Sequence, residues 1–334
     1  MDLSLGLGDF FGGLFSSNEL VFSALGPRGS GKTTLLACMN KEFERVMPGA
    51  FFPSDRGTFK KLNDAYRFLE AEASSPTVKF DINDTISATE NLSRTAFTIK
   101  GHKKSVNVSF FDFPGAWLNG DDDNGYNQVV KIVKSSSVVM ITINSPAIMF
   151  SNGKFKSRAA IDEIEQIIRE SLQDDPTDKL FLFIPIKCER YTRTDSDTKK
   201  LTDKIKELFS STLNLDNNPL YHGHLAMALL PIHTAGNVQF SCFKAKRGTE
   251  ELTGEVYLKD INQKFCPRDA DQPLRYAMSF LLNQSEKQAS GGIWGYITSL
   301  FSGDMKEVAE MIRKGIKKRG NGFEIFCGRD LLGF

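Results

Sequence analysis

The residues with the clearest chemical meaning form one short run, residues 26–33, which reads G-P-R-G-S-G-K-T. This run fits the G-x-x-x-x-G-K-T pattern of a phosphate-binding loop, whose glycines let backbone N–H groups surround a diphosphate. The ammonium of Lys32 is predicted to reach the outer phosphates, and the hydroxyl of Thr33 to hold Mg²⁺. The run therefore predicts a nucleoside-phosphate site, and the further residues expected to contact the ligand there are Gly26, Gly29, Ser30, Gly31 and Thr34.

The elements on either side of this run are of the kind that a phosphate loop needs. Residues 19–25 form a short, mostly apolar strand candidate, and residues 34–46 repeat apolar side chains at helical spacing. The alternative is a chance match in a glycine-rich turn, which would not require this order of strand, loop and helix. The order therefore favours a phosphate loop.

A second run with phosphate chemistry is D-F-P-G, which starts at Asp112 directly after the strand candidate at residues 105–111. A carboxylate at the end of a buried strand beside a phosphate loop can hold a magnesium-bound water. The N–H of Gly115 can contact the terminal phosphate and would lose this contact when that phosphate leaves. A plain turn after a strand is the alternative, but the nearby phosphate loop favours a metal ligand and a nucleotide-sensing segment.

The order of these motifs resembles that of the translation-factor-related class of P-loop GTPases. The run D-F-P-G-A-W-L at residues 112–118 also resembles the D-[YF]-P-G-x-W-L stretch of YcjX-type stress-associated and double-GTPase-like P-loop proteins. The similarity of pattern covers roughly residues 19–286. It implies a divergent GTPase that binds GTP or GDP with Mg²⁺ and acts as a nucleotide-dependent switch. A protein effector of unknown identity is expected as its partner.

The resemblance implies two segments that recognise the base. Where the class has N/T-K-x-D, this chain has I-K-C-E at residues 186–189, so that Lys187 would stack along the base and Glu189 would accept the guanine N1 and N2 donors. The usual first polar residue is missing, and a salt-bridged turn is the alternative. Thr234 and Ala235 resemble the S/T-A-x box of the class. Guanine is preferred over adenine, and an ATPase of the same fold remains the alternative.

Three positions bear on hydrolysis of the nucleotide. Thr89 is expected to complete the magnesium coordination and the catalytic site, with Thr85 and Thr95 as alternatives. Many GTPases orient the attacking water with Gln after D-x-x-G, but this chain has Ala116, so turnover is expected to be slow. Arg28 is a hypothetical arginine finger, and a solvent-facing loop charge is the other interpretation. A nucleotide-holding scaffold without turnover also remains open.

Strand candidates alternate with helix candidates, which predicts a three-layer α/β/α domain over residues 19–286 with a mostly parallel sheet and one antiparallel edge strand. A helical insertion is expected at about residues 43–93, and an added hairpin at about residues 236–260. The predicted core strands are residues 19–25, 94–100, 105–111, 137–143, 179–187 and 225–233. The predicted helices are residues 34–46, 59–73, 157–172, 198–209 and 272–284.

The two ends of the chain differ from this domain. Residues 1–18 are apolar, and residues 287–334 form an amphipathic, helical tail with many basic side chains. Packing of the tail on the domain or on a partner is the preferred interpretation. A basic amphipathic helix can also lie on an anionic membrane surface, so peripheral contact at the cytoplasmic face is the alternative, and a homo-oligomer stays open.

The net charge, the cysteine content and the apolar runs of the 334-residue chain argue against several kinds of partner, site and location. A net charge of +1 argues against a broad nucleic-acid surface, so no nucleic-acid partner is expected. The 5 cysteines form no C-x-x-C pair and support neither a disulfide framework nor a zinc site. The start of the chain lacks the basic residues of a secretory signal, and no apolar run is long enough to cross a bilayer. A cytoplasmic location is expected.

Overall fold

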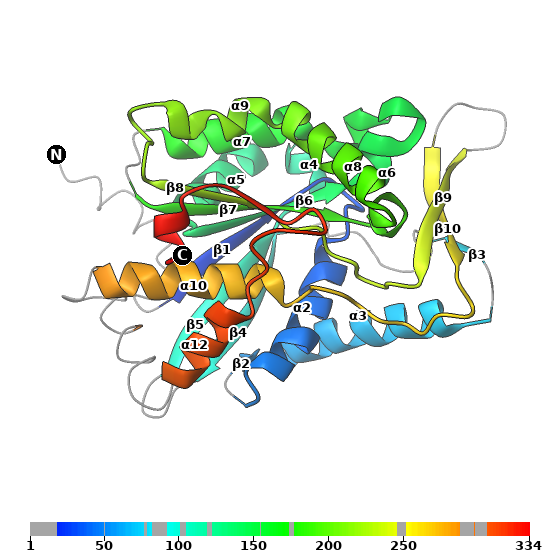
Figure 1. Ribbon diagram of the computed structural model, residues 1–334, viewed down its shortest axis with the longest axis horizontal. Coiled ribbons are helices and arrows are strands. Elements are labelled where there is room, and N and C mark those ends of the chain that lie inside the picture. The colour runs from blue at the N-terminus through cyan, green and yellow to red at the C-terminus, as the bar shows by residue number, and fades with distance from the viewer. Residues whose placement is uncertain are drawn as a thin grey trace.

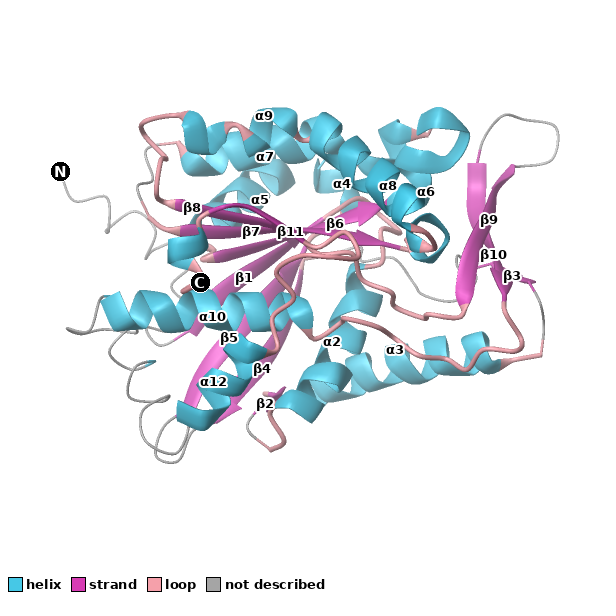
Figure 2. Ribbon diagram, in the orientation of Figure 1, coloured by secondary structure: helices cyan, strands magenta, loops and turns pink. Residues whose placement is uncertain are grey.

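The phosphate-loop run leaves the end of a central strand in the computed structural model (Figure 1). The structure describes residues 19–49, 51–76, 79–81, 92–100, 105–118, 122–153, 155–173, 177–245, 252–287, 297 and 306–334. Within these residues an 8-stranded sheet has the order β11-β8-β7-β6-β1-β5-β4-β2. Helices cover both of its faces, so the predicted three-layer α/β/α architecture is confirmed (Figure 2).

The middle of the sheet consists of parallel strands that are buried on both faces, which explains why they read as nearly continuous apolar runs. These strands are β5 (Ser105–Asp112), β1 (Glu19–Leu25), β6 (Val138–Asn144), β7 (Lys179–Ile186) and β8 (Leu225–Leu229). The antiparallel strands are β4 (Ser93–Lys100), β2 (Phe51–Pro53) and β11 (Glu324–Cys327).

The predicted antiparallel strand is present as β4, but it does not lie at the edge. The three-residue strand β2 pairs with β4 and forms one edge, and β11 pairs with β8 and forms the other. Both edge strands are too short to produce a periodic sequence pattern, which is why the sequence predicted neither of them. Part of the predicted helical tail is therefore a strand of the central sheet.

Two groups of helices make the outer layers (Figure 1). One face carries α2 (Lys32–Val46), α3 (Arg56–Ser74), α10 (Gln272–Lys287) and α12 (Lys306–Lys314). The opposite face carries α5 (Asp123–Ser135), α7 (Ile161–Leu172) and α8 (Asp195–Leu208). Shorter helices are α4 (Gly115–Leu118), α6 (Ser145–Met149) and α9 (Ser210–Leu213), with 3-10 helices at Phe150–Gly153, Lys156–Ala159, Glu189–Thr192, Leu215–Asn217 and Arg329–Leu331.

A row of phenylalanine rings joins the insertion to the core. The ring centroids of Phe22 and Phe110 lie 5.0 Å apart, and those of Phe110 and Phe97 lie 5.4 Å apart. The ring of Phe51 on β2 continues the row at 4.8 Å from Phe97 and 5.1 Å from Phe43 of α2. The insertion thus contains the predicted helix, as α3, and is anchored through a buried aromatic residue that precedes it.

A second, smaller sheet lies beyond one end of the central sheet (Figures 1 and 2). The predicted added hairpin forms two of its strands, β9 (Val238–Ala245) and β10 (Leu252–Lys259). The third strand, β3 (Lys79–Asp81), comes from the insertion and pairs antiparallel with β10. Segments that lie far apart in the sequence therefore share one sheet.

The C-terminal segment packs on the domain in the part that the structure describes. Ile312 of α12 and the nearby Ile316 are buried. Tyr276 of α10 donates a hydrogen bond from its hydroxyl to the carbonyl of Lys317 at 2.7 Å. Among the described helices none is both long and apolar enough to cross a membrane.

Candidate functional site

The phosphate loop is held in shape by close backbone contacts. Gly26 has a φ of 154°, and an added Cβ there would lie 2.1 Å from Oγ1 of Thr142. The Thr142 hydroxyl lies 2.9 Å from the hydroxyl of Ser30 and donates to the carbonyl of Leu25 at 3.0 Å. Because the Ser30 side chain faces Thr142, a ligand contact of Ser30 would come from its backbone. Strand β6 thus supports the loop through the side chain of Thr142.

The loop leads directly into the N-terminus of α2, which has Gly31 as its N-cap with a φ of 99°. The described first turn contains no acidic side chain and no side-chain cap for its N–H groups. Helix N-termini carry a partial positive charge and unpaired N–H donors, so this end of α2 is suited to bind an anion. The fold therefore provides the cradle that the run G-P-R-G-S-G-K-T predicts.

Lys32 and Asp112 meet at this cradle, as predicted, although 80 positions separate them in the sequence. Their charged atoms, Nζ and Oδ1, lie 3.4 Å apart, and both residues are buried. The Lys32 ammonium also donates to the Gly26 carbonyl at 2.7 Å. Burial lowers the pKa of Lys32, and the charge of Asp112 partly opposes this effect. The pair is therefore a buried cation and a carboxylate facing the phosphate cradle.

The residues predicted to hold Mg²⁺ fit that ion by their chemistry. Thr33 lies half-buried in the first turn of α2, and Asp112 ends β5 on the neighbouring strand. Hydroxyl and carboxylate oxygens suit Mg²⁺, which uses few protein ligands and completes its shell with phosphate oxygens and water. Among the described residues no group of three or more His, Cys, Asp or Glu side chains gathers at one point, so a site made of protein groups alone is not formed there.

The predicted switch threonine, Thr89, and the alternative Thr85 lie outside the described residues. The other alternative, Thr95, lies inside β4 opposite Phe110, where its side chain is 1% exposed. A threonine ligand for the ion therefore stays a prediction.

Gly115 starts α4 and lies directly against the phosphate loop. A Cβ added to Gly115 would lie 2.5 Å from the backbone nitrogen of Arg28. Any larger residue would push the two segments apart, so a glycine is required at this contact. The Arg28 side chain is exposed. The structure thus brings the D-x-x-G run and the phosphate loop together.

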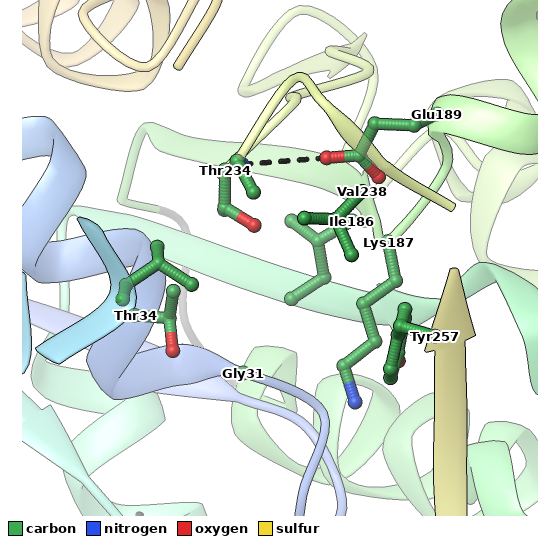
Figure 3. Close-up of a pocket in the computed structure, with 10 residues that line it drawn as sticks. Gly31, Thr34, Ile186, Lys187, Glu189, Thr234, Val238 and Tyr257 are labelled. Carbon is green, nitrogen blue, oxygen red and sulfur yellow. Dashed lines mark hydrogen bonds between the residues drawn. The ribbon is translucent and has the colours of Figure 1, made fainter. Parts of the chain in front are cut away.

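A cavity opens beside the cradle, and the predicted base-recognition residues line it (Figure 3). It has about 410 Å³ of space free of protein atoms, part of which is open solvent. Thr34 lies across the cavity from Lys187 and Tyr257 (Figure 3). The lining residues are Gly31, Thr34, Leu69, Ile186, Lys187, Glu189, Thr234, Ala235, Val238 and Tyr257.

The two predicted base-recognition runs are joined by Glu189. Its Oε1 accepts hydrogen bonds from the backbone N–H groups of Ala235 and Gly236, each at 3.4 Å. Burial raises the pKa of the Glu189 carboxyl, and these N–H groups partly oppose the increase. Thr234 and Ala235 therefore lie beside a carboxyl group that borders the cavity, and their contact with a base stays a prediction.

Lys187 links the cavity to the phosphate loop. Its backbone has a φ of 56°, and its ammonium donates to the carbonyl of Gly29 at 2.6 Å. An added Cβ on Gly31 would lie 3.8 Å from Cε of Lys187, so the lysine stem runs along the loop. Lys187 also forms an ion pair with Glu255, so a salt-bridged turn, the alternative that the sequence left open, describes part of this geometry.

Several residues of the site were not predicted. Leu69 comes from α3 of the insertion, and Val238 and Tyr257 come from the small sheet. Glu255 of β10 forms an ion pair with Lys187. Glu255 and Tyr257 stand two positions apart in a strand candidate, so the sequence places them on one face. It does not reveal that this face is turned towards the phosphate loop.

Comparisons with known proteins place this geometry in context. The chain is similar to the S. cerevisiae Ski7 GTPase-like domain bound to GTP, with 12% identity and a TM-score of 0.38, over 70% of this chain and 45% of that chain. It is also similar to Methanosarcina barkeri Roco2 RocCORdC bound to GDP, with 14% identity and a TM-score of 0.29, over 65% of this chain and 44% of that one. The chain thus spans less than half of either structure. No curated protein matches it.

A family model, Double-GTPase 2, matches residues 21–219. This match starts in β1 and includes the phosphate loop, the D-x-x-G run and the first base-recognition run. The predicted resemblance to divergent P-loop GTPases is thereby confirmed. Since the match covers more than half of the 334 residues, the chain belongs to the Double-GTPase 2 family.

Proposed function

We propose that this protein binds GTP and GDP together with Mg²⁺ and hydrolyses GTP slowly, as a nucleotide-dependent switch. The observation that carries the proposal is the meeting of two sets of groups at Gly31, which belongs to the phosphate cradle and also lines the adjoining cavity. Lys32 and Asp112 face the cradle, and Lys187 and Glu189 border the cavity. A nucleotide could place its phosphates in the cradle and its base in the cavity.

At the phosphate end, the protein supplies charge and donors. The N-terminus of α2 and the Lys32 ammonium stabilise the negative charge of the phosphates. Thr33 and Asp112 would hold Mg²⁺, which neutralises charge on the outer phosphates when it is bound. Gly115 would lose a contact when the terminal phosphate leaves, so we expect segments around residues 115–118 and Thr89 to change with nucleotide state.

At the base end, the chemistry favours guanine. Guanine presents two N–H donor groups on one edge, at N1 and N2, and a carboxylate such as that of Glu189 can accept both. Adenine presents one amino donor next to an acceptor nitrogen, so Glu189 could accept from only one group on that edge. An ATPase of the same fold is the competing proposal, because the I-K-C-E run departs from N/T-K-x-D at two positions.

Hydrolysis is expected to be slow, because Ala116 stands where a water-orienting Gln is common. The exposed Arg28 lies next to Gly115 and has the length to reach a terminal phosphate. We propose it as an arginine finger, and single-turnover hydrolysis by Arg28→Ala tests this role. An unchanged rate of hydrolysis would mean that Arg28 is a solvent-facing loop charge with no role in the reaction. A scaffold that holds nucleotide without turnover is a further proposal, supported if phosphate release stays at background.

The experiment that tests nucleotide binding is calorimetry with GTP, GDP and ATP on the full chain and on Lys32→Ala. We expect the wild type to bind GTP and GDP more tightly than ATP, and the variant to bind none of them measurably. Retained GTP binding by Lys32→Ala would refute the assigned role of the phosphate loop. Equal or tighter binding of ATP would support the ATPase instead.

The partners follow from the same features. A protein effector would be expected to contact residues 115–118 and Arg28, where the loss of a phosphate changes the surface. Peripheral membrane contact through the C-terminal tail is less favoured than from the sequence alone, because Ile312 and Ile316 pack inside the domain. Co-sedimentation with anionic vesicles tests this contact.

A further inference from the structure

The Lys187 ammonium lies between two acceptors that come from different parts of the chain. One is the carbonyl of Gly29 in the phosphate loop, at 2.6 Å, and the other is Oε2 of Glu255 on β10, at 2.5 Å. Both charged side chains are buried, with Lys187 7% exposed and Glu255 4% exposed. A buried ammonium without a nearby anion would be costly, so the position of Lys187 depends on what lies beside it.

Three side chains, those of Lys187, Asn144 and Tyr257, hold Glu255 as a charged acceptor. Asn144 donates to its Oε1 at 2.6 Å, and the hydroxyl of Tyr257 donates to its Oε2 at 2.7 Å. Burial alone would raise the pKa of Glu255, but the charge of Lys187 and these hydrogen bonds hold it below its ordinary value. The carboxylate is therefore ionised near neutral pH and fixed in place, so it can orient Lys187.

The hairpin that carries Glu255 is attached to the domain by other contacts. Asn237, directly before β9, donates to the carbonyl of Ala73 at 3.0 Å. The ring of Phe240 packs against that of Phe150 with 5.3 Å between centroids, next to the ring of Phe243. The hairpin thus has its own anchors, and removal of the Glu255 charge would leave it docked.

We infer that Glu255 is a positioning residue of the nucleotide site, which holds the Lys187 ammonium against the Gly29 carbonyl so that the lysine stem forms a wall of the base cavity. The inference rests on the proposed nucleotide function and adds the small sheet to the site. Without the carboxylate, Lys187 would turn towards water, and the base would lose the wall that the lysine stem forms. A nucleotide would then bind the same phosphate cradle more weakly.

A double-mutant cycle on the full chain tests this role, with GDP and Mg²⁺ as the probe and calorimetry as the measurement. The variants are Glu255→Gln, Lys187→Met and the double variant, with Glu207→Gln as a control because Glu207 is an exposed glutamate of α8. If Glu255 acts through Lys187, Glu255→Gln weakens GDP binding about 10-fold, but adds less than about 2-fold once Lys187 is Met. Glu207→Gln keeps the wild-type affinity.

The outcomes separate this inference from the proposed function. Wild-type affinity in Glu255→Gln, or a loss that is equally large in the Lys187→Met background, would overturn the positioning role while nucleotide binding stands. A wild-type protein that binds no GDP would overturn the proposed function and this inference with it. If circular dichroism shows that Glu255→Gln is unfolded, Glu255→Asp takes its place in the cycle, since it keeps the charge and shortens the reach.

Discussion

The backbone of Lys187 has a left-handed conformation, with a φ of 56°, that residues other than glycine seldom adopt. Such a conformation costs about 1–2 kcal/mol for a residue with a side chain. It turns the chain sharply after β7, so that Lys187 and Glu189 both border the cavity. Such conformations are found at functional sites, and the position of Lys187 at the cavity agrees with this tendency.

Glu189 predicts a pH dependence of guanine-nucleotide binding. Burial raises the pKa of its carboxyl, whereas the guanine donors would favour the ionised form. Affinity for GDP should therefore fall as the pH drops through the raised pKa, by up to about 10-fold per pH unit. Calorimetry at several pH values measures this, and Glu189→Gln should retain only the dependence that comes from the phosphates. Parallel pH profiles for the two proteins would contradict the role of Glu189.

The same carboxyl affects stability with the opposite sign. Because its pKa is raised in the folded state, its contribution to the free energy of unfolding is fully present below the unfolded-state pKa. The contribution is lost as the pH rises through the folded-state pKa. Nucleotide binding thus improves over the pH range in which the free protein loses this small part of its stability.

At this scale the sequence could predict the positions that are encoded by spacing within one run. The positions of Lys32, Thr33 and Asp112 are of this kind, because a phosphate loop and a strand end define them, whereas their roles toward a ligand stay predictions. Glu255 could not be predicted, since its role depends on where a separate hairpin docks. Tertiary placement of an added element leaves no local pattern.

At the scale of elements, the short strand β2 shows how an insertion is attached to a parallel sheet. Its residue Phe51 is 1% exposed and lies between the rings of Phe43 and Phe97. The neighbouring Phe52 points the other way and is 37% exposed. Successive side chains of a strand face opposite sides. Phe51 therefore anchors the segment in the core, and Phe52 faces away from the core.

This difference predicts unequal effects of two adjacent substitutions. Phe51→Ala should lower the free energy of unfolding by about 3–5 kcal/mol, because it removes a buried ring and leaves a cavity. Phe52→Ala should change it by less than about 1 kcal/mol, since its side chain is largely on the surface. Denaturant unfolding followed by circular dichroism measures both values. Similar losses for the two variants would show that Phe51 does not anchor the insertion.

The elements that were predicted and those that were missed differ in length and in pattern. The central strands and α2, α3, α7, α8 and α10 were predicted, because long apolar or periodic runs encode them. Helix α5 was missed, although Asp122 caps it by accepting hydrogen bonds from Asn124 and Gly125, both at 3.1 Å. An Asp before a helix start was the available signal. Strands of three or four residues, such as β2 and β11, carry no such signal in the sequence.

At the scale of the whole molecule, the cavity beside the phosphate loop is lined by parts of the chain that are far apart in sequence. The insertion contributes Leu69, the phosphate loop Gly31, and the small sheet Tyr257. The small sheet itself joins β3 of the insertion to the hairpin. A ligand in this cavity would contact all three parts, so its binding should stabilise the domain as a unit.

This arrangement predicts a nucleotide-dependent rise in melting temperature. A ligand present at 100 times its dissociation constant adds about 2.7 kcal/mol to the free energy of unfolding. GDP with Mg²⁺ should therefore raise the melting temperature by several degrees, and EDTA should reduce the gain. Thermal unfolding followed by circular dichroism measures this shift. Lys32→Ala should show no shift, and an equal shift in this variant would place the bound nucleotide elsewhere.

The bracing of the phosphate loop by Thr142 has a kinetic consequence. Since the hydroxyl of Thr142 contacts both Ser30 and Leu25, the curved backbone is already formed in the free protein. The conformational entropy of closing the loop is lost during folding and not during the encounter with a ligand. Capture of an anion should then be governed by diffusion and charge, so that differences in lifetime between ligands arise in the dissociation rate.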